Sequence, residues 1–145
     1  MSKQHAFWDA SALVPLCVDE MTSRRAQSQL RESMPVVWWG TLVEVHSALA
    51  RLQREGKLRD TNSEGPVSRL KMLSHTWREI TPSEALRERS IQLLDAYQLR
   101  AADSLQLAAA LTWCRDRPAR RRFVCADERL SKGAAHAGFD VVDLS

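Results

Sequence analysis

The sequence predicts an α/β fold, in which a short parallel sheet of four or five strands is covered by helices on both faces. Short apolar segments rich in β-branched and aromatic residues alternate along the chain with longer segments whose apolar residues recur at helical spacing. Glycine, proline and helix-capping residues separate the segments. Strands that alternate with helices in this way pair in parallel through right-handed crossovers.

The first quarter of the chain contains two predicted strands with helical segments between them. Residues 5–8 are predicted as a short strand, and a helical turn over 11–17 follows it directly. The polar, amphipathic stretch from about 20 to 32 indicates a helix, which must end before Pro35. Residues 36–38 are apolar and mostly β-branched, so they form the second predicted strand.

Two helices are expected between the second strand and the third. From 41 to 54 the apolar residues recur at i, i+3, i+7 and i+10, which is the pattern of one helix face. A polar linker runs from about 56 to 66, and a second helix covers about 67 to 76. Residues 78–80 form a weaker strand candidate, placed there because Thr81-Pro-Ser-Glu84 is a strong helix start.

The rest of the chain predicts three helices and two strands. In the helix that begins near residue 84, Ile91, Leu94 and Tyr97 fit a core-facing stripe. The other expected elements are an alanine- and leucine-rich helix over 101–114, a strand over 122–125, a helix over 127–136 and a final strand over 140–142. We expect residues 1–145 to form a single domain, since this is close to the commonest domain length.

The composition is that of an ordinary water-soluble domain, with 44% hydrophobic and 27% charged residues. No apolar run approaches the ~20 residues that a membrane helix needs, and the first strand begins too early for a signal peptide. We therefore expect a cytoplasmic protein without membrane contact. The net charge of +3 is compatible with nucleic-acid binding but does not require it. The three cysteines form no Cys-x-x-Cys pair, so we expect buried free thiols.

Four carboxylates stand where a strand is expected to end or a helix to begin: Asp9, Glu44, Asp103 and Asp127. The C-terminal ends of parallel strands converge on one crevice in an α/β fold, so these side chains should meet there. Acids gathered at one edge repel one another unless a cation lies between them, and Mg²⁺ or Mn²⁺ is the usual one. A metal site of this kind indicates phosphate chemistry.

Helix capping explains each of these acids when it is taken singly. Thr41-Leu-Val-Glu44 has the pattern of a capping box, and Asp127 fits an N-cap. Asp9 and Asp103 would simply favour a positive helix N-terminus. The four together favour a metal instead, because a half-buried carboxylate without a cation is costly and tends to become protonated.

The motifs around the four acids resemble those of PIN-domain nucleases, in particular the VapC-type toxins of bacterial and archaeal toxin–antitoxin pairs. The matching segments are Trp8-Asp9-Ala-Ser-Ala-Leu, Leu42-Val-Glu44-Val-His-Ser-Ala-Leu, Arg100-Ala-Ala-Asp103-Ser-Leu-Gln-Leu-Ala and Val124-Cys-Ala-Asp127-Glu-Arg-Leu. They occur in order and at the usual spacing over essentially the whole chain.

The resemblance implies a three-layer α/β/α sandwich and an endoribonuclease that cuts RNA with the help of Mg²⁺ or Mn²⁺. By position, the acids that would be catalytic and hold the metal are Asp9, Glu44, Asp103 and Asp127, and Ser11 would line the site. We expect Asp9 and Asp103 to be the principal metal ligands. The resemblance also implies a cognate antitoxin as a protein partner.

Basic residues near the expected helix starts are candidates for phosphate contacts, namely Arg100, Arg129 and Lys132. A denser group of arginines over 115–122 joins the end of a helix to the start of a strand, and an RNA-binding patch is one interpretation of it. That position lies at the edge of the sheet opposite the acids, so we favour a solvated loop or an oligomer surface over an RNA-binding patch.

A homodimer is also expected, because the helices after the first and second strands carry more apolar residues than one core needs. Trp38 or Trp39 and Leu49 are among these residues. An exposed Trp39 would also be able to stack on a nucleic-acid base.

Two other enzyme and signalling classes that cluster acids at this edge fit less well. A receiver-type signalling domain needs an acidic pair after the first strand and a lysine near the last one, and this chain has neither. A haloacid-dehalogenase-type phosphatase needs Asp-x-Asp where this chain has Asp9-Ala-Ser11. The non-enzyme alternative is a catalytically silent PIN-like module used only for binding, and the presence of all four acids argues against it.

Overall fold

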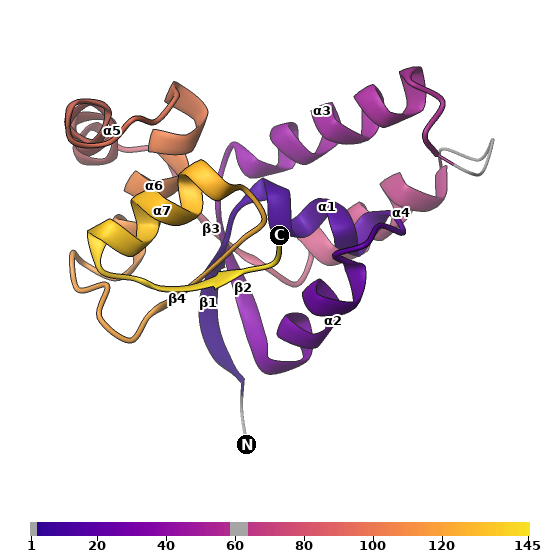
Figure 1. Cartoon of the computed structure of the whole chain (residues 1–145), viewed down its shortest axis with the longest axis horizontal. Coiled ribbons are helices and arrows are strands. Elements are labelled where there is room, and N and C mark those ends of the chain that lie inside the picture. Colours follow the sequence, from indigo (N-terminus) through magenta and orange to yellow (C-terminus); the bar gives the residue numbers. More distant parts are fainter. Residues whose placement is uncertain (1–2, 59–63) are drawn as a thin grey trace.

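The computed structural model of the protein describes residues 3–58 and 64–145. Its strands are β1 (Gln4–Trp8), β2 (Ser33–Trp38), β3 (Arg78–Ile80), β4 (Arg122–Cys125) and β5 (Asp140–Asp143). Its helices are α1 (Ala10–Cys17), α2 (Ser23–Glu32), α3 (Thr41–Arg54), α4 (Glu64–Ser74), α5 (Glu84–Ala96), α6 (Ala101–Trp113) and α7 (Glu128–Ala137). Figure 1 shows the sheet between two groups of helices, α1–α4 on one side and α5–α7 on the other.

The strands of the described chain all run parallel, in the order β3-β2-β1-β4-β5. The chain moves outward from β1 to β2 and β3, and then crosses back through α5 and α6 to β4 and β5. The direction of winding therefore reverses between β1 and β4. Because ligands of open α/β sheets bind outside the carboxyl ends of the strands at such a switch point, the candidate site lies beyond Trp8 and Cys125.

Both faces of the sheet are buried, and the alternation of side chains along each strand separates two cores. In β1, Phe7 points into the core under α5–α7, whereas Ala6 and Trp8 point into the core under α1–α4. In β2, Val36 and Val37 divide in the same way. A strand with two buried faces appears in the sequence as a continuous apolar run, which is why these strands were recognisable.

The expected fold class is confirmed as a three-layer α/β/α arrangement around a short parallel sheet. Most boundaries lie within a few residues of the expected ones, and β2 differs most among the strands because it begins at Ser33 and includes Pro35. β3 pairs only with Val36–Trp38, so Pro35 lies where β2 has a neighbour on one side alone. A proline, which cannot donate a hydrogen bond, is tolerated at such a position.

The start of α4 and the N-cap of α5 differ from the expected ones. α4 begins at Glu64 rather than near residue 67, since Pro66 stands in the first turn, where a backbone N–H has no partner within the helix. Residues 59–63 of the expected linker lie outside the described residues. α5 begins where expected, but its N-cap is Ser83, whose hydroxyl accepts a hydrogen bond from the backbone N–H of Leu86 at 3.1 Å.

The stripe of α5 that faces the core is not the expected one. Leu86 and Leu93 are buried, whereas Ile91 and Leu94 are 56% and 41% exposed. Both stripes are apolar, so helical spacing alone could not choose between them, and the packing of α5 against α6 decides. Tyr97, at the end of α5, packs against the core as expected.

Two of the residues cited for a homodimer belong to the protein's own cores. Trp38 and Leu49 are buried, so that part of the argument is wrong. Trp39 is 54% exposed at the C-terminal end of β2, and Val43 is exposed one turn along in α3. The homodimer itself stays a prediction.

All three cysteines are free and buried, as expected. Within residues 3–58 and 64–145, none of the helices combines the length and the hydropathy that crossing a bilayer requires.

Candidate functional site

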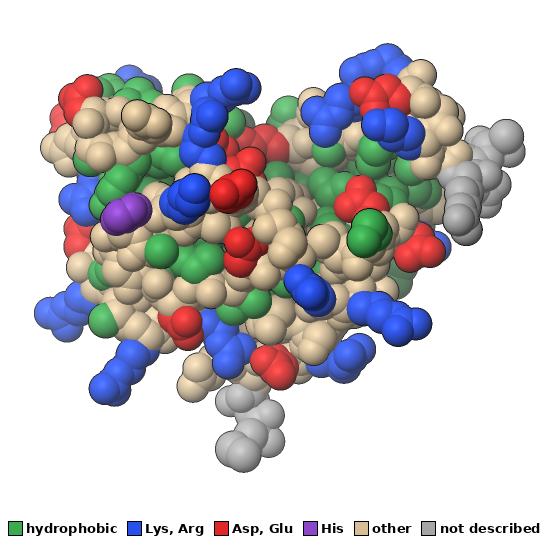
Figure 2. All heavy atoms as spheres, viewed as in Figure 1, with side chains coloured by type: hydrophobic (Ala, Val, Ile, Leu, Met, Phe, Trp, Pro, Cys, Tyr) green, Lys and Arg blue, Asp and Glu red, His purple; other side chains and the backbone are tan. Residues whose placement is uncertain are grey.

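The four acids singled out from the sequence come together at the C-terminal edge of the sheet. Asp9 follows β1 and caps α1, Asp127 follows β4 and caps α7, and Glu44 and Asp103 stand in the first turns of α3 and α6. Their charges act on one another, since Asp127 raises the pKa of Asp9 and of Asp103, and Asp103 raises that of Glu44. Figure 2 shows acidic side chains in a hollow between the lobe that contains α5 and the lobe that contains α3.

Asp9 is the most buried of the four, at 5% exposed, and its orientation is fixed by Ser11. The Ser11 hydroxyl donates to one carboxylate oxygen of Asp9 at 2.8 Å, and the Ser11 backbone N–H donates to the other at 3.2 Å. The same hydroxyl accepts a hydrogen bond from the backbone N–H of Ala126 at 2.8 Å. Ser11 therefore ties together the ends of β1 and β4, and it lines the site as expected.

Burial dominates the electrostatics of Asp9. Removal from water raises the pKa of this carboxyl to about 7; the hydrogen bonds from Ser11 lower it, and the negative charge of Asp127 raises it. Half of the Asp9 side chains would therefore be protonated near neutral pH in the metal-free protein. A bound cation would favour the charged form instead, because an opposite charge lowers the pKa of a carboxyl group.

Glu44 is held by a residue that the sequence did not single out. The amide of Gln106 donates one hydrogen bond to the Glu44 carboxylate and another to the Thr41 hydroxyl, the latter at 2.9 Å. Gln106 is buried in an otherwise apolar stretch of α6, and its side-chain oxygen has no hydrogen-bond partner among the residues that the structure describes. A lone amide three residues after Asp103 on an alanine- and leucine-rich helix was the signal that could have identified it.

The capping-box interpretation of Thr41 and Glu44 is wrong. α3 begins at Thr41, its N-cap is Gly40, and no side chain caps it. Burial raises the pKa of Glu44, the hydrogen bond from Gln106 lowers it, and the charge of Asp103 raises it. Glu44 thus faces the other acids rather than the backbone of its own helix. Asp127, in contrast, is an N-cap as expected, and accepts from the backbone N–H of Leu130 at 2.8 Å.

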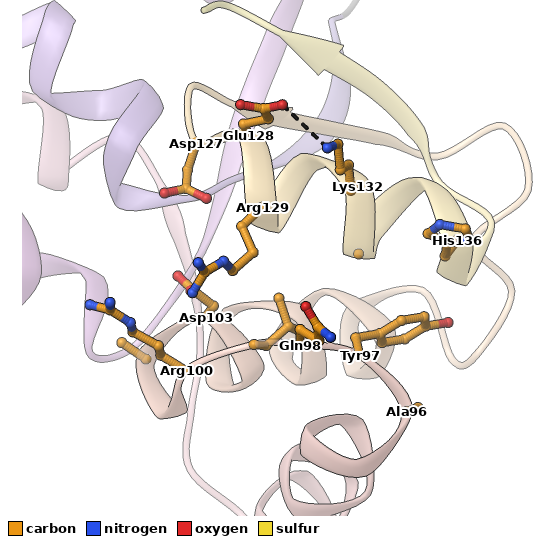
Figure 3. Close-up of a pocket in the computed structure, with 13 residues that line it drawn as sticks. Ala96, Tyr97, Gln98, Arg100, Asp103, Asp127, Glu128, Arg129, Lys132 and His136 are labelled. Atoms are coloured by element: carbon orange, nitrogen blue, oxygen red, sulfur yellow. Dashed lines mark ion pairs between the residues drawn. The ribbon is translucent and has the colours of Figure 1, made fainter.

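Asp103 lies between the other acids and two arginines. Burial and the charge of Asp127 raise its pKa, while the backbone N–H of Arg100 and the guanidinium groups of Arg129 and Arg100 lower it. Figure 3 shows Arg129 reaching from α7 toward Asp103, with Arg100 on the other side of that carboxylate. Two cations of the protein itself therefore lie close to the acids, and both arginines are at the C-terminal edge of the sheet, as expected.

The side chains supply the right donors for a hard divalent cation, but they are not arranged around one. Among the residues that the structure describes, no group of three or more His, Cys, Asp or Glu side chains is placed to hold a metal ion. Carboxylate oxygens are the ligands that Mg²⁺ prefers, and this ion is commonly held by one or two carboxylates with water in its other positions. Asp9 is buried, Asp103 is half-buried, and each is repelled by Asp127, so these two acids fit that demand.

The arginine group over 115–122 lies at the opposite edge of the sheet, at the start of β4, as expected. Arg121 stacks on the ring of Trp113 at 5.5 Å, and Arg122 pairs with Glu32 at 3.2 Å. These contacts hold the loop between α6 and β4 against the body of the protein. The group lies far from the acids along the strand direction.

No protein-family model matches the sequence, and no curated protein matches it either. The fold, however, is similar to that of solved structures. A toxin–antitoxin complex from Klebsiella pneumoniae has a chain with 19% identity and a TM-score of 0.64, and the alignment covers 97% of this chain and 98% of that one.

Two further structures are similar to the same extent. PAE2754 from Pyrobaculum aerophilum has 16% identity and a TM-score of 0.66, with 97% of this chain and 84% of that chain covered. VapBC2 from Rickettsia felis, bound to a DNA fragment from its promoter, has a chain with 10% identity and a TM-score of 0.66, with 97% and 98% covered. At these identities the likeness shows the fold, and the expected PIN-like α/β/α fold is confirmed.

Proposed function

We propose that this protein is a metal-dependent endoribonuclease that hydrolyses RNA phosphodiester bonds and acts as the toxin of a toxin–antitoxin pair. The observation that carries the proposal is the convergence of Asp9, Glu44, Asp103 and Asp127 at the switch point of the sheet. Two of the structurally similar proteins support the second half of the proposal, since one is described as a toxin–antitoxin complex and the other as VapBC2.

Asp9 and Asp103 would be the principal ligands of a Mg²⁺ or Mn²⁺ ion, supported by Glu44 and Asp127. Such an ion, when bound, polarises the phosphodiester and lowers the pKa of an attacking water. No nucleophilic side chain is required, which agrees with the buried, unreactive state of Cys125, whose pKa is raised by burial.

The residues around the acids have distinct parts in this scheme. Ser11 keeps the Asp9 carboxylate pointing toward the crevice, and Gln106 does the same for Glu44. Arg100 and Arg129 flank Asp103, where they would pair with the non-bridging oxygens of the substrate phosphate. If these guanidinium groups paired with the phosphate, they would no longer offset the negative charge of Asp103. Asp103 would then be a stronger ligand for a divalent cation.

An antitoxin would inhibit the enzyme by occupying the same crevice. Acids that attract a metal ion also attract an arginine or lysine side chain from a partner protein. A partner cation placed among Asp9, Asp103 and Asp127 would exclude the metal without any change in the fold.

Cleavage of single-stranded RNA tests the enzymatic half of the proposal. The purified protein should cut RNA with Mg²⁺ or Mn²⁺ and stop on addition of EDTA, and Asp9→Ala should lose most of the activity while keeping its circular dichroism spectrum. Asp140→Asn is the matched control, because Asp140 is an exposed acid at the opposite edge of the sheet. Cleavage that persists in EDTA or in Asp9→Ala would contradict a metal-based mechanism.

Expression in a bacterial host tests the toxin half. The wild-type protein alone should arrest growth, co-expression of the adjacent gene should restore it, and Asp9→Ala should be harmless without that gene. Wild-type protein that is present on a blot while growth and RNA stay intact would remove the toxin assignment. RNA binding without cleavage in any metal would instead favour the silent binding module, which the two arginines beside Asp103 would also suit.

A further inference from the structure

The crevice that holds the acids continues into a groove whose far end has no part in the proposed reaction. This groove, called here the α6–α7 groove, has a volume of about 890 Å³ and lies between the segment from Ala96 to Asp103 and the face of α7 that runs from Asp127 to His136. Asp103 and Asp127 form one end of it, and Tyr97 and His136 form the other. Figure 3 shows this arrangement.

Basic side chains follow one face of α7 along the groove. Arg129, Lys132 and His136 stand at positions i, i+3 and i+7, which places all three on the same side of the helix. Each of them lines the groove, and Arg100 lies opposite Arg129. Lys132 is 71% exposed and paired with Glu128 at 3.2 Å, an exposed ion pair of little strength that a phosphate can readily replace.

The far end of the groove is aromatic. The rings of Tyr97 and His136 are nearly parallel, at 28°, with their centroids 6.1 Å apart, and they join the end of α5 to the last turn of α7. Tyr97 packs on the core, whereas His136 is exposed. Gln98 lies beside them and offers an amide donor and acceptor. The exposed imidazole of His136 ends this stack, and an exposed ring with polar groups at its edge is what an unstacked nucleic-acid base requires.

The length of the groove fits a short piece of a nucleic-acid strand. From Asp127 to His136 the helix rises by about 13 Å, at about 1.5 Å per residue. A stacked strand advances about 3.4 Å per nucleotide, so the groove spans roughly four phosphates. With histidine counted as neutral, three cationic and three anionic side chains line it: Arg100, Arg129 and Lys132 against Asp103, Asp127 and Glu128. A divalent cation on the acids would leave the groove with a net positive charge, which favours a polyanion.

We propose that the α6–α7 groove binds the single-stranded RNA segment on one side of the scissile phosphate, with Arg100 and Arg129 on phosphates and the Tyr97–His136 pair stacked on a base a few nucleotides away. This inference rests on the proposed ribonuclease function and adds to it a substrate-positioning site. Most of the side chains that line the groove are charged or polar, which suits a nucleotide strand better than an apolar peptide segment.

Binding of a labelled RNA to the intact protein tests the groove separately from catalysis. The probe is a fluorescein-labelled single-stranded RNA of about eight nucleotides, a length within the usual site sizes of single-strand binders, measured by anisotropy with the Asp9→Asn protein to prevent cleavage. His136→Ala and Tyr97→Leu should each raise the Kd by about tenfold, the effect of one lost base–aromatic contact. Tyr97→Phe, which keeps the ring, should bind much as the parent does.

Two further variants complete the design. Arg129→Ala should weaken binding and reduce the slope of log Kd against log salt by about one, as expected for one lost phosphate contact. Arg117→Ala removes an equal charge from the opposite edge of the sheet and should leave the Kd unchanged. If Tyr97→Leu proves unstable because Tyr97 packs on the core, the exposed His136→Ala still decides the outcome.

The failures of the two proposals are distinguishable. Suppose the wild-type protein cleaves RNA in a metal-dependent way, but His136→Ala binds RNA as tightly as its parent. The proposed RNA site in the groove would then be wrong, and the proposed nuclease function would stand. RNA binding that depends on Tyr97 and His136, without cleavage in the presence of any metal, would support the proposed RNA site and contradict the proposed nuclease function. Groove variants that no longer bind the antitoxin, but bind RNA as tightly as the parent, would show that the groove binds a peptide. This result would overturn the inference.

Discussion

Asp9 provides a direct test of the electrostatics, because its burial makes the stability of the metal-free protein depend on pH. The carboxyl has an ordinary pKa of 3.8 in the unfolded chain and about 7 in the folded one. Below pH 4 the Asp9 carboxyl is mostly protonated in both the folded and the unfolded chain, so its ionisation does not lower the free energy of unfolding. As the pH rises toward 7 the unfolded chain releases its proton while the folded one retains it, so stability falls, and above pH 7 the loss is complete.

The size of the effect follows from the pKa. One pKa unit corresponds to about 1.4 kcal/mol, so the full loss above pH 7 is about 4 kcal/mol. Asp9→Asn removes it, and an asparagine still accepts the hydrogen bond from the backbone N–H of Ser11 that caps α1. The variant should therefore be more stable than the wild type at pH 8, and the difference between the two proteins should shrink by about 3 kcal/mol on going down to pH 5.

Urea unfolding in a chelating buffer at several pH values measures this difference. Asp140→Asn serves as the control, since this exposed acid lies at the other edge of the sheet and should give no such trend. Added Mn²⁺ should stabilise the wild type at pH 8 and leave Asp9→Asn nearly unchanged. A difference that stays constant from pH 5 to pH 8, or one that grows toward low pH, would refute the claim that burial controls Asp9.

Three further changes probe the rest of the site. Asp103→Asn should lose most Mn²⁺ binding in a calorimetric titration, and equal binding by the variant and the wild type would exclude Asp103 as a principal ligand. Gln106→Leu keeps the size of the side chain in an apolar stretch of α6 and should still fold, yet it should bind Mn²⁺ about 10- to 100-fold more weakly, since Glu44 loses its hydrogen-bond donor; unchanged affinity would show that Glu44 needs no such support. Gly40→Ala should lower the free energy of unfolding by about 1–3 kcal/mol, because its Cβ would stand 2.6 Å from the indole nitrogen of buried Trp38; a urea midpoint equal to that of the wild type would contradict this.

The sequence predicted the fold and the meeting of the acids because both depend on local patterns. A strand buried on both faces is an apolar run, and the one or two residues after it must lie at the carboxyl edge, so Asp9 and Asp127 could be placed without coordinates. Asp103 was recognisable as the charged residue at the start of an apolar helix.

What the sequence could not predict depends on how elements lie against one another. α5 carries two apolar stripes, and only its contact with α6 shows that Leu93 rather than Leu94 is buried. Gln106 was invisible as a partner of Glu44 because the two are 62 positions apart and meet only when α3 and α6 come together at the edge of the sheet. The proximity of Arg129 to Asp103 has the same cause.

That proximity changes how the site should respond to its ligands. Arg129 now balances part of the charge of Asp103, so a metal ion and the arginine compete for the same carboxylate. An RNA phosphate that pairs with Arg129 would remove this competition for Asp103. Substrate and metal should therefore bind cooperatively. The prediction is that Mn²⁺ binds Arg129→Ala more tightly than the wild type when RNA is absent, and that RNA strengthens Mn²⁺ binding in the wild type alone. Calorimetric titration of Mn²⁺ into both proteins, with and without a non-cleavable RNA analogue, measures it; weaker Mn²⁺ binding by Arg129→Ala would show that the arginine supports the metal site and does not compete with it.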